Sequence, residues 1–240
     1  MAIRRALKPA RMAGVDAVRA AALVAMIAYH FCFDLRYYGV LHADFEHDPY
    51  WIAARTLILS TFLFMAGVSA ALAAHAQQPP ASYWRHIGII AGCALLVSAG
   101  SYALFPRTFI WFGVLHAIAI SLALAYPLVR RPRLALAIGL VVIVIGNVIA
   151  HPAFDNRALG WLGFMTSPPW TEDYVPLFPW AGIVFCGIPA GAWLARLGRD
   201  PLPALANTPR GVLWLGRHTL VIYMLHQPIL MGLLSLVLRR

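Results

Sequence analysis

Long apolar stretches separated by short polar turns dominate the pattern of this chain. An apolar window of about 20 residues is long enough to cross a bilayer as a helix. The windows predict seven membrane-spanning helices, at residues 13–34, 52–74, 87–105, 109–129, 134–150, 176–195 and 219–238. We therefore expect an all-α fold, a polytopic integral membrane helical bundle. Because no repeat or long linker divides the chain, residues 1–240 are expected to form one membrane-embedded domain.

Composition and charge support a membrane protein and indicate its orientation. Of the residues, 61% are hydrophobic and only 12% are charged, whereas an ordinary soluble domain has roughly 25% charged residues. The net charge of +10 does not indicate a nucleic-acid partner, because the basic residues lie in short loops that set topology. Eleven fall on the side of the N-terminus: Arg4, Arg5, Lys8, Arg11, Arg85, Arg130, Arg131, Arg133, Arg196, Arg199 and Arg210.

The opposite side has five basic residues, which predicts a cytoplasmic N-terminus under the positive-inside rule. Arg239 and Arg240 are two of these five, and seven spans would place them outside the cell, against the rule. Six spans, or an additional re-entrant segment, therefore stay open as alternatives.

Four ionisable residues lie within the first apolar window, where each would cost several kcal/mol unless it is paired or faces a polar cavity. Arg19 and His30 are eleven residues apart, almost three helical turns, so the two side chains point the same way. Asp16 precedes Arg19 by three residues and Asp34 follows His30 by four, spacings that share a helix face. One face of this helix is therefore expected to carry polar chemistry.

The two basic residues of this face suit different steps of a reaction. Arg19 and His30 are separated by about 16 Å along a helix, so they lie at two depths of the membrane. The guanidinium of Arg19 suits phosphate or carboxylate. His30 suits proton transfer, with Asp34 orienting it. The alternative is that Asp16 and Arg19 form a structural ion pair and His30 lies at the interface.

Other polar residues within or beside apolar windows are candidates for the same cavity. Tyr223 and His226 are three residues apart in the last window and face together. His116 lies in the fourth window, where a hydrogen-bonded packing role is equally compatible. Asp173 stands just before the sixth window, where two prolines fix the chain direction or simply begin a helix.

No metal, thiolate or soluble-enzyme motif is predicted. His42 and His47 flank Asp44 in a polar loop, but two histidines without a defined spacing favour a solvated loop over a metal site. The three cysteines lie in apolar segments and form no CxxC pair. Neither a phosphate-binding glycine loop nor a nucleophile elbow occurs.

Five segments, in order VDAVRA, FLFMAGVS, FGVLH, DYVPLFPW and WLGRHTLVIYMLHQP, resemble the catalytic domain of the heparan-alpha-glucosaminide N-acetyltransferase family and its short bacterial relatives. The resemblance extends from about Arg11 to Pro228. It implies an enzyme of the bacterial cytoplasmic (inner) membrane that takes acyl groups, typically acetyl, from cytoplasmic acyl-CoA and delivers them to an extracytoplasmic sugar or glycoconjugate. Membrane lipids are expected partners, no metal is expected, and a homodimer is compatible with it.

The resemblance also assigns candidate site residues. Family pattern residues fall on Asp16, Arg19, Gly67, Ser69, Gly113, Asp173, Tyr223 and His226. On the donor side, Arg19 with Asp16, and Arg55 or Arg85, would meet acetyl-CoA. On the acceptor side, the expected substrate-binding residues are His116, Asp173, Tyr223 and His226.

Two histidines are candidates for the catalytic base. The Arg19-x10-His30 spacing is similar to the arginine–histidine motif of membrane acyltransferases that modify extracytoplasmic sugars. The animal enzymes of the resembled family instead have their catalytic histidine in the following external loop, where His47 precedes Trp51 here. Direct transfer with histidine as base and an acyl-histidine intermediate are both compatible with these residues.

Two functions of other classes remain open. A polar stripe through the bilayer would also serve a transporter or flippase for an anionic sugar or lipid. The set His30, His116 and His226 would suit axial ligation of a membrane haem.

Overall fold

A computed structural model describes residues 12–198, 200, 205 and 207–238, and these residues form nine α-helices and one 3-10 helix. The α-helices are α1 Ala13–Tyr37, α2 Pro49–His75, α3 Pro80–Leu104, α4 Val114–Ala125, α5 Pro132–Val148, α6 Arg157–Gly160, α7 Leu177–Leu197, α8 Arg210–Arg217 and α9 Thr219–Val237, and the 3-10 helix is η1 Pro152–Phe154. The basic residues Arg4, Arg5, Lys8, Arg11, Arg199, Arg239 and Arg240 lie outside the described part of the chain.

The expected all-helical membrane architecture is confirmed. Within the described ranges, the helices α1, α2, α3, α7 and α9 are long and apolar enough to cross a membrane. The helices α4 and α5 are also apolar but shorter. The count of seven spans and the orientation of the N-terminus stay predictions.

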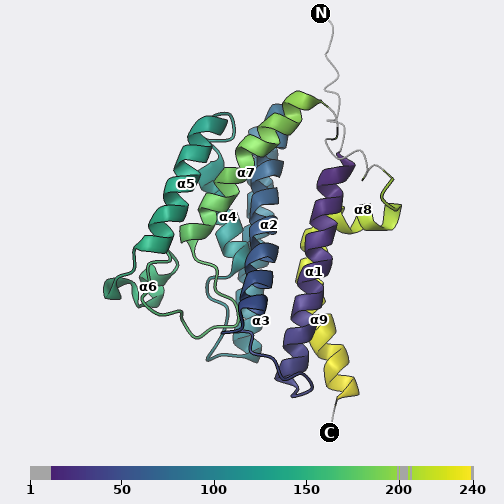
Figure 1. The fold of residues 1–240 in the computed structure, drawn as a ribbon, viewed down its shortest axis with the longest axis vertical. Coiled ribbons are helices and arrows are strands. Elements are labelled where there is room, and N and C mark those ends of the chain that lie inside the picture. Colours follow the sequence, from purple (N-terminus) through teal and green to yellow (C-terminus); the bar gives the residue numbers. More distant parts are fainter. Residues whose placement is uncertain (1–11, 199, 201–204, 206, 239–240) are drawn as a thin grey trace, which may run out of the picture.

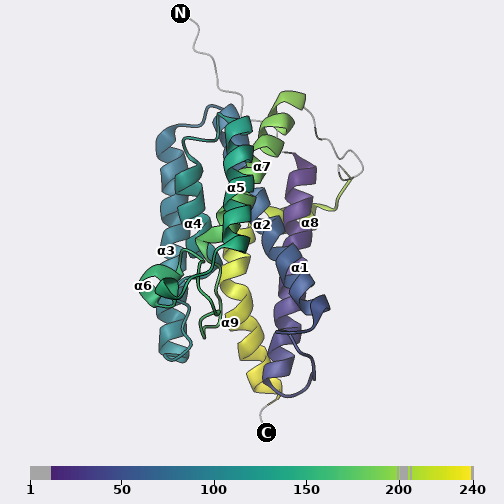
Figure 2. The same cartoon turned by 60° about the vertical axis from the view of Figure 1, so that its left-hand side comes forward.

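The helices form two groups. The helices α1 and α9 stand side by side, with α8 projecting from the end of the bundle where α1 begins (Figure 1). The larger group contains α2, α3, α4, α5 and α7, in which α7 packs against both α2 and α5 (Figures 1 and 2). The contacts of α1 with α2 and of α9 with α3 join the two groups.

Three helices cover only part of the length of the bundle. The lower ends of α4, α5 and α7 lie well above the lower ends of α1, α3 and α9 (Figures 1 and 2). Residues 105–113 and 149–176 connect these helices and occupy the lower part of the group. Non-helical backbone at membrane depth is tolerated where it is buried in protein or lines a cavity, so these segments are placed to build a site.

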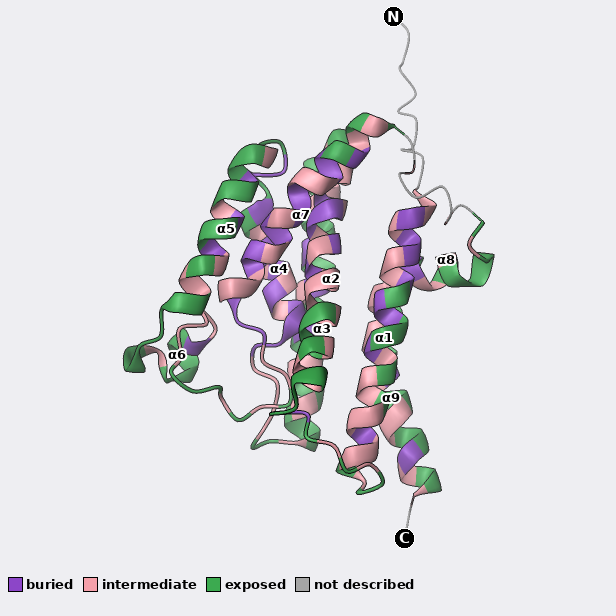
Figure 3. Ribbon diagram, in the orientation of Figure 1, coloured by how far each residue is buried: buried purple, intermediate pink, exposed green. Residues whose placement is uncertain are grey.

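Glycines bring α2 and α7 into close contact. A Cβ atom on Gly67 would lie 1.9 Å from the carbonyl oxygen of Val184, and one on Gly187 would lie 2.1 Å from that of Phe64. Small residues allow helix backbones in membranes to approach in this way. Buried positions are most frequent on α4 and α7, while much of α3, α5 and α9 is exposed (Figure 3).

Candidate functional site

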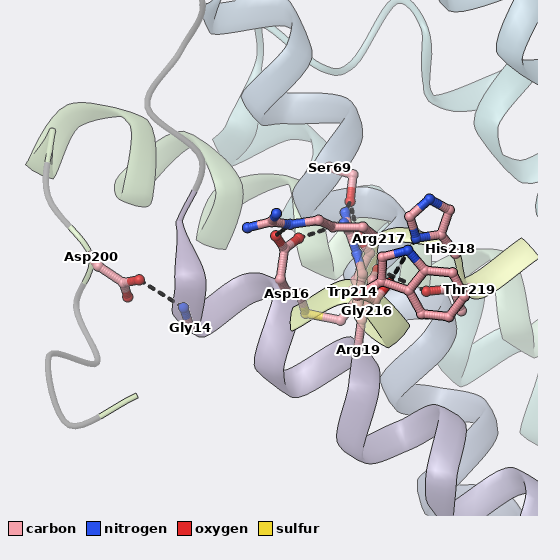
Figure 4. A network of polar contacts seen from close by, with 11 residues as sticks. Gly14, Asp16, Arg19, Ser69, Asp200, Trp214, Gly216, Arg217, His218 and Thr219 are labelled. Carbon is pink, nitrogen blue, oxygen red and sulfur yellow. Dashed lines mark hydrogen bonds and ion pairs between the residues drawn. The ribbon is translucent and has the colours of Figure 1, made fainter. Parts of the chain in front are cut away.

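A charged network lies at the start of α1, around the buried carboxylate of Asp16 (Figure 4). Its Oδ1 atom lies 3.6 Å from Nη1 of Arg19, and its Oδ2 atom accepts a hydrogen bond from Nε of Arg217 at 2.9 Å. Arg19 also donates to the hydroxyl of Ser69 on α2, which in turn donates to the carbonyl of Met65. The expected pairing of Asp16 with Arg19 is therefore present, and it extends to two further helices.

Arg217 is a member of this network that the sequence did not assign. It reaches Asp16 because α8 lies directly against α1. A Cβ atom on Gly216 would lie 1.9 Å from the carbonyl oxygen of Asp16, so only glycine permits this approach. The signal in the sequence was the Gly216-Arg217 pair at the start of the last family-like segment.

A pair of histidines forms the second part of the site, nearer the other end of α1. The ring centroids of His30 on α1 and His226 on α9 are 5.0 Å apart with an interplanar angle of 62°. The ring of Tyr223 lies 5.5 Å from that of His226. His30, Tyr223 and His226, predicted separately from two distant segments, are thus brought together.

The hydrogen bonding of His226 assigns the roles of its two ring nitrogens. Its Nδ1 atom lies 2.6 Å from the carbonyl oxygen of Tyr223, which can only accept a hydrogen bond. A neutral ring therefore carries its proton on Nδ1 and leaves the lone pair on Nε2. This Nε2 atom is buried and has no hydrogen-bond partner among the described residues, so it is available to a substrate proton or an acyl group.

Asp34 is buried beside this pair but contacts a different residue from the one expected. Its Oδ1 atom accepts a hydrogen bond from Nε2 of Gln227 at 2.6 Å. The described residues show no hydrogen bond from His30 to Asp34. The i+4 spacing places His30 and Asp34 on one face of α1. The side-chain amide of Gln227, on the adjacent α9, donates to the carboxylate of Asp34 instead. The Oδ2 atom of Asp34 and the Oε1 atom of Gln227 have no hydrogen-bond partner in the described part of the chain.

The loop that holds His47 is anchored next to His30. Phe45 is 2% exposed, and its ring lies 4.2 Å from that of Trp51 and 5.4 Å from that of Tyr29, between centroids. His47 itself is exposed, with its Nδ1 atom 3.0 Å from Oδ2 of Asp44. Hydrogen bonds from the backbone N–H groups of His47 and Glu46, with a smaller contribution from the His47 side chain, lower the pKa of Asp44.

Asp173 marks the third part of the site, where segment 105–113 meets the end of segment 149–176. Its Oδ2 atom accepts a hydrogen bond from the backbone N–H of Val114 at 2.9 Å, at the first turn of α4. A Cβ atom on Gly113 would lie 2.2 Å from the same oxygen. Asp173 also lies within electrostatic range of Tyr223. The family-like residues Gly113, Asp173 and Tyr223 therefore form one cluster.

Arg55 belongs to this cluster and not to the network around Arg19. Its charge acts on Asp173 and on Tyr29. Along α2 it precedes Ser69, the contact of Arg19, by fourteen residues, which is about 21 Å of helix. Arg55 thus lies apart from the network around Arg19, and its contact with acetyl-CoA stays a prediction. Arg85 lies exposed near the start of α3.

His116 has the hydrogen-bonded packing environment that was the alternative to a substrate-binding role. Its Nδ1 atom accepts from the backbone N–H of Gly113 at 3.2 Å, and its Nε2 atom lies 3.3 Å from the hydroxyl of Ser98. The ring stacks on Phe112 at 5.5 Å. His116 thus fixes the turn that presents Asp173 to the first turn of α4.

Asp173 should make the stability of the protein depend on pH with a defined sign. Burial of the carboxyl, the largest cause, raises its pKa from 3.8 to about 6. A raised folded-state pKa contributes stability below the unfolded-state pKa, and this contribution is lost as the pH rises through the folded-state value. From about pH 4 to about pH 7, we expect the native protein to lose roughly 2 kcal/mol of stability relative to the Asp173→Asn variant.

Melting temperatures of the two proteins at several pH values within this interval measure the effect. A difference that does not change with pH would contradict the assignment of the raised pKa to Asp173. The variant Glu172→Gln, at an exposed neighbouring position, is the matched control and should leave the pH dependence unchanged.

Within the described residues, no group of three or more His, Cys, Asp or Glu side chains is arranged to hold a metal ion. The cysteines Cys32, Cys93 and Cys186 are free thiols.

Comparison with protein-family profiles gives a match. A family profile described as "Heparan-alpha-glucosaminide N-acetyltransferase, catalytic" matches residues 11–228, nearly the whole chain. Searches of the curated proteins and of the solved structures give no significant match.

Proposed function

Since the chain belongs to the heparan-alpha-glucosaminide N-acetyltransferase catalytic family, we propose that it is a membrane enzyme that transfers an acetyl group from cytoplasmic acyl-CoA to a hydroxyl or amine of an extracytoplasmic sugar or glycoconjugate. The observation that carries this proposal is the contact of His30 with His226, because it adds a histidine with a free buried Nε2 atom to the family match. A buried base of this kind suits acyl transfer.

The donor side of the proposed reaction is the network of Asp16, Arg19 and Arg217. Asp16 holds both guanidinium groups in place through its two carboxylate oxygens. The side chains of Arg19 and Arg217 are 26% and 38% exposed, so the positive charge of both guanidinium groups is accessible to the phosphates of acyl-CoA. Arg85, exposed near the start of α3, is a further candidate contact for these phosphates.

The acceptor side is the cluster around the histidine pair. His226 or His30 would remove the proton of the acceptor hydroxyl or amine while the acceptor oxygen or nitrogen attacks the thioester carbonyl. The bond from the carbonyl carbon to sulfur then breaks, and the CoA thiolate leaves with a proton from the histidinium. Asp173, Arg55 and Tyr223 would orient the acceptor, with Asp34 and Gln227 supporting α1 and α9 in register.

An assay in sealed proteoliposomes tests the whole proposal. Labelled acetyl-CoA is added on one side and a panel of amino and neutral sugars is enclosed on the other. We expect labelled sugar to form inside together with an equal amount of free CoA outside. Empty liposomes and liposomes with boiled protein are the controls.

Two outcomes would reject the proposal. Sugar movement without release of CoA would indicate a transporter. No transfer to any sugar, in protein that keeps its native melting temperature, would remove the sugar acceptor from the proposal.

A further inference from the structure

A basic cavity lies on the far side of the bundle from the network of Asp16 and Arg19. It has a volume of about 560 Å³ and opens between the start of α5 and the last turns of α7. Figure 1 shows α5 on one side of the bundle and α1 on the other. Among the described contacts between helices, α5 packs on α7 and not on α1.

Three arginines line this cavity: Arg131, Arg133 and Arg196. All three are exposed, and the described ion pairs engage none of them. The lining contains no carboxylate. Arg131 also occupies the N-cap position of the seventeen-residue helix α5, whose N-terminal end carries partial positive charge. The cavity therefore holds three positive charges without a counter-ion from the described part of the chain.

The remaining wall of the cavity is apolar and faces outward. Leu134, Leu136 and Trp193 line it and are 43%, 40% and 54% exposed. In a bilayer, outward-facing apolar side chains of this kind would contact lipid acyl chains. Tryptophan is also enriched at the level of lipid headgroups. A positive rim above an apolar wall matches a ligand with an anionic head and an apolar tail.

We infer that this cavity binds the phosphate of an anionic phospholipid, with Arg131, Arg133 and Arg196 around the headgroup and the acyl chains along Leu134, Leu136 and Trp193. Basic pockets between membrane helices recognise such headgroups. A soluble phosphate compound shares the headgroup chemistry but would leave the apolar wall without a ligand, so the lipid fits the whole cavity better. The inference does not depend on the proposed acetyl transfer.

Native mass spectrometry of the purified protein in detergent tests this inference. Phosphatidylglycerol and, as a zwitterionic control, phosphatidylcholine are titrated separately. We expect phosphatidylglycerol to bind more tightly than phosphatidylcholine. Because a basic residue near an anionic surface strengthens attraction roughly fivefold, the triple variant Arg131→Gln, Arg133→Gln, Arg196→Gln should bind phosphatidylglycerol at least about tenfold more weakly.

Arg210→Gln is the matched control, since Arg210 is exposed at the start of α8 and does not line the cavity. It should bind phosphatidylglycerol as the native protein does. If the triple variant does not fold, as judged from its melting temperature, the three single variants replace it, each with an expected loss of about fivefold.

Three results would overturn the inference: equal affinity for the two lipids, unchanged affinity in the folded variants, or full displacement of phosphatidylglycerol by CoA or pyrophosphate. The last result would assign the cavity to a soluble phosphate ligand.

Discussion

Replacing His30 by alanine is expected to lower the rate of acetyl transfer by about 10²–10⁴-fold, the range typical of a lost general base. The variant should still fold, because alanine favours helix and His30 makes ring contacts with only Tyr29 and His226 among the described residues. The rate of CoA release with saturating acetyl-CoA and sugar measures the effect. The melting temperature of the variant reports whether it is folded.

The second histidine of the pair makes this experiment more specific. His226→Ala should lower the rate of acetyl transfer by a similar factor. If the two rings act as a unit, the double variant should be little slower than the less active of the two single variants. His75→Ala is the matched control. Like His226, His75 has its Nδ1 atom close to a backbone carbonyl oxygen of its own helix, that of Ala71, at 2.9 Å. His75 differs from His226 in lying at the exposed end of α2.

Full activity in folded His30→Ala protein would reject the role of His30. Loss of activity in His47→Ala alone would move the catalytic base to the external loop. Label that stays on denatured protein after incubation with acetyl-CoA without sugar would indicate an acyl-histidine intermediate, and its absence in His226→Ala would identify the acylated ring.

Replacing Gly67 by alanine is expected to destabilise the protein by roughly 1–3 kcal/mol, because a methyl group must be inserted into a packed interface. The new Cβ atom would lie 1.9 Å from the carbonyl oxygen of Val184 and 3.2 Å from the Cα atom of Gly187. Both neighbours are backbone, so relief requires α2 and α7 to separate. A lower melting temperature, together with lower activity at physiological temperature, is the expected measurement.

Gly92→Ala is the matched control within α3. A Cβ atom there has no neighbour within 4 Å, and alanine is more favourable than glycine in a helix by roughly 0.5–1 kcal/mol. We therefore expect this variant to be as stable as the native protein or more so. An equal fall in melting temperature for both variants would show that the contact of α2 with α7 is not the cause.

The apolar windows predicted the helical membrane architecture well, because a span must be long, apolar and uninterrupted. They overestimated the length of the fourth helix, expected at 109–129, since hydropathy cannot show which part of an apolar segment is helical. In the structure α4 begins at Val114, because Gly113 and Asp173 build a turn there. The family-like segment FGVLH marked the position without showing its geometry.

Local spacing predicted local contacts and missed distant ones. The ion pair of Asp16 with Arg19 follows from an i+3 spacing on one helix. The contacts of Asp16 with Arg217 and of Asp34 with Gln227 join residues 201 and 193 positions apart. They depend on how α8 and α9 dock on α1, which neither periodicity nor composition specifies.

The short helix α4 has a consequence for how tightly the membrane stays sealed. Its twelve residues rise about 18 Å, against about 30 Å for a hydrocarbon core. In the proposed reaction, a donor and an acceptor that enter from opposite faces would meet at the histidine pair, after each has crossed only part of the bilayer. Neither substrate would then have to pass beyond the histidine pair. Acetyl groups would then be exported without opening a continuous aqueous pore, so the ion gradients that energise the cell would be kept during turnover.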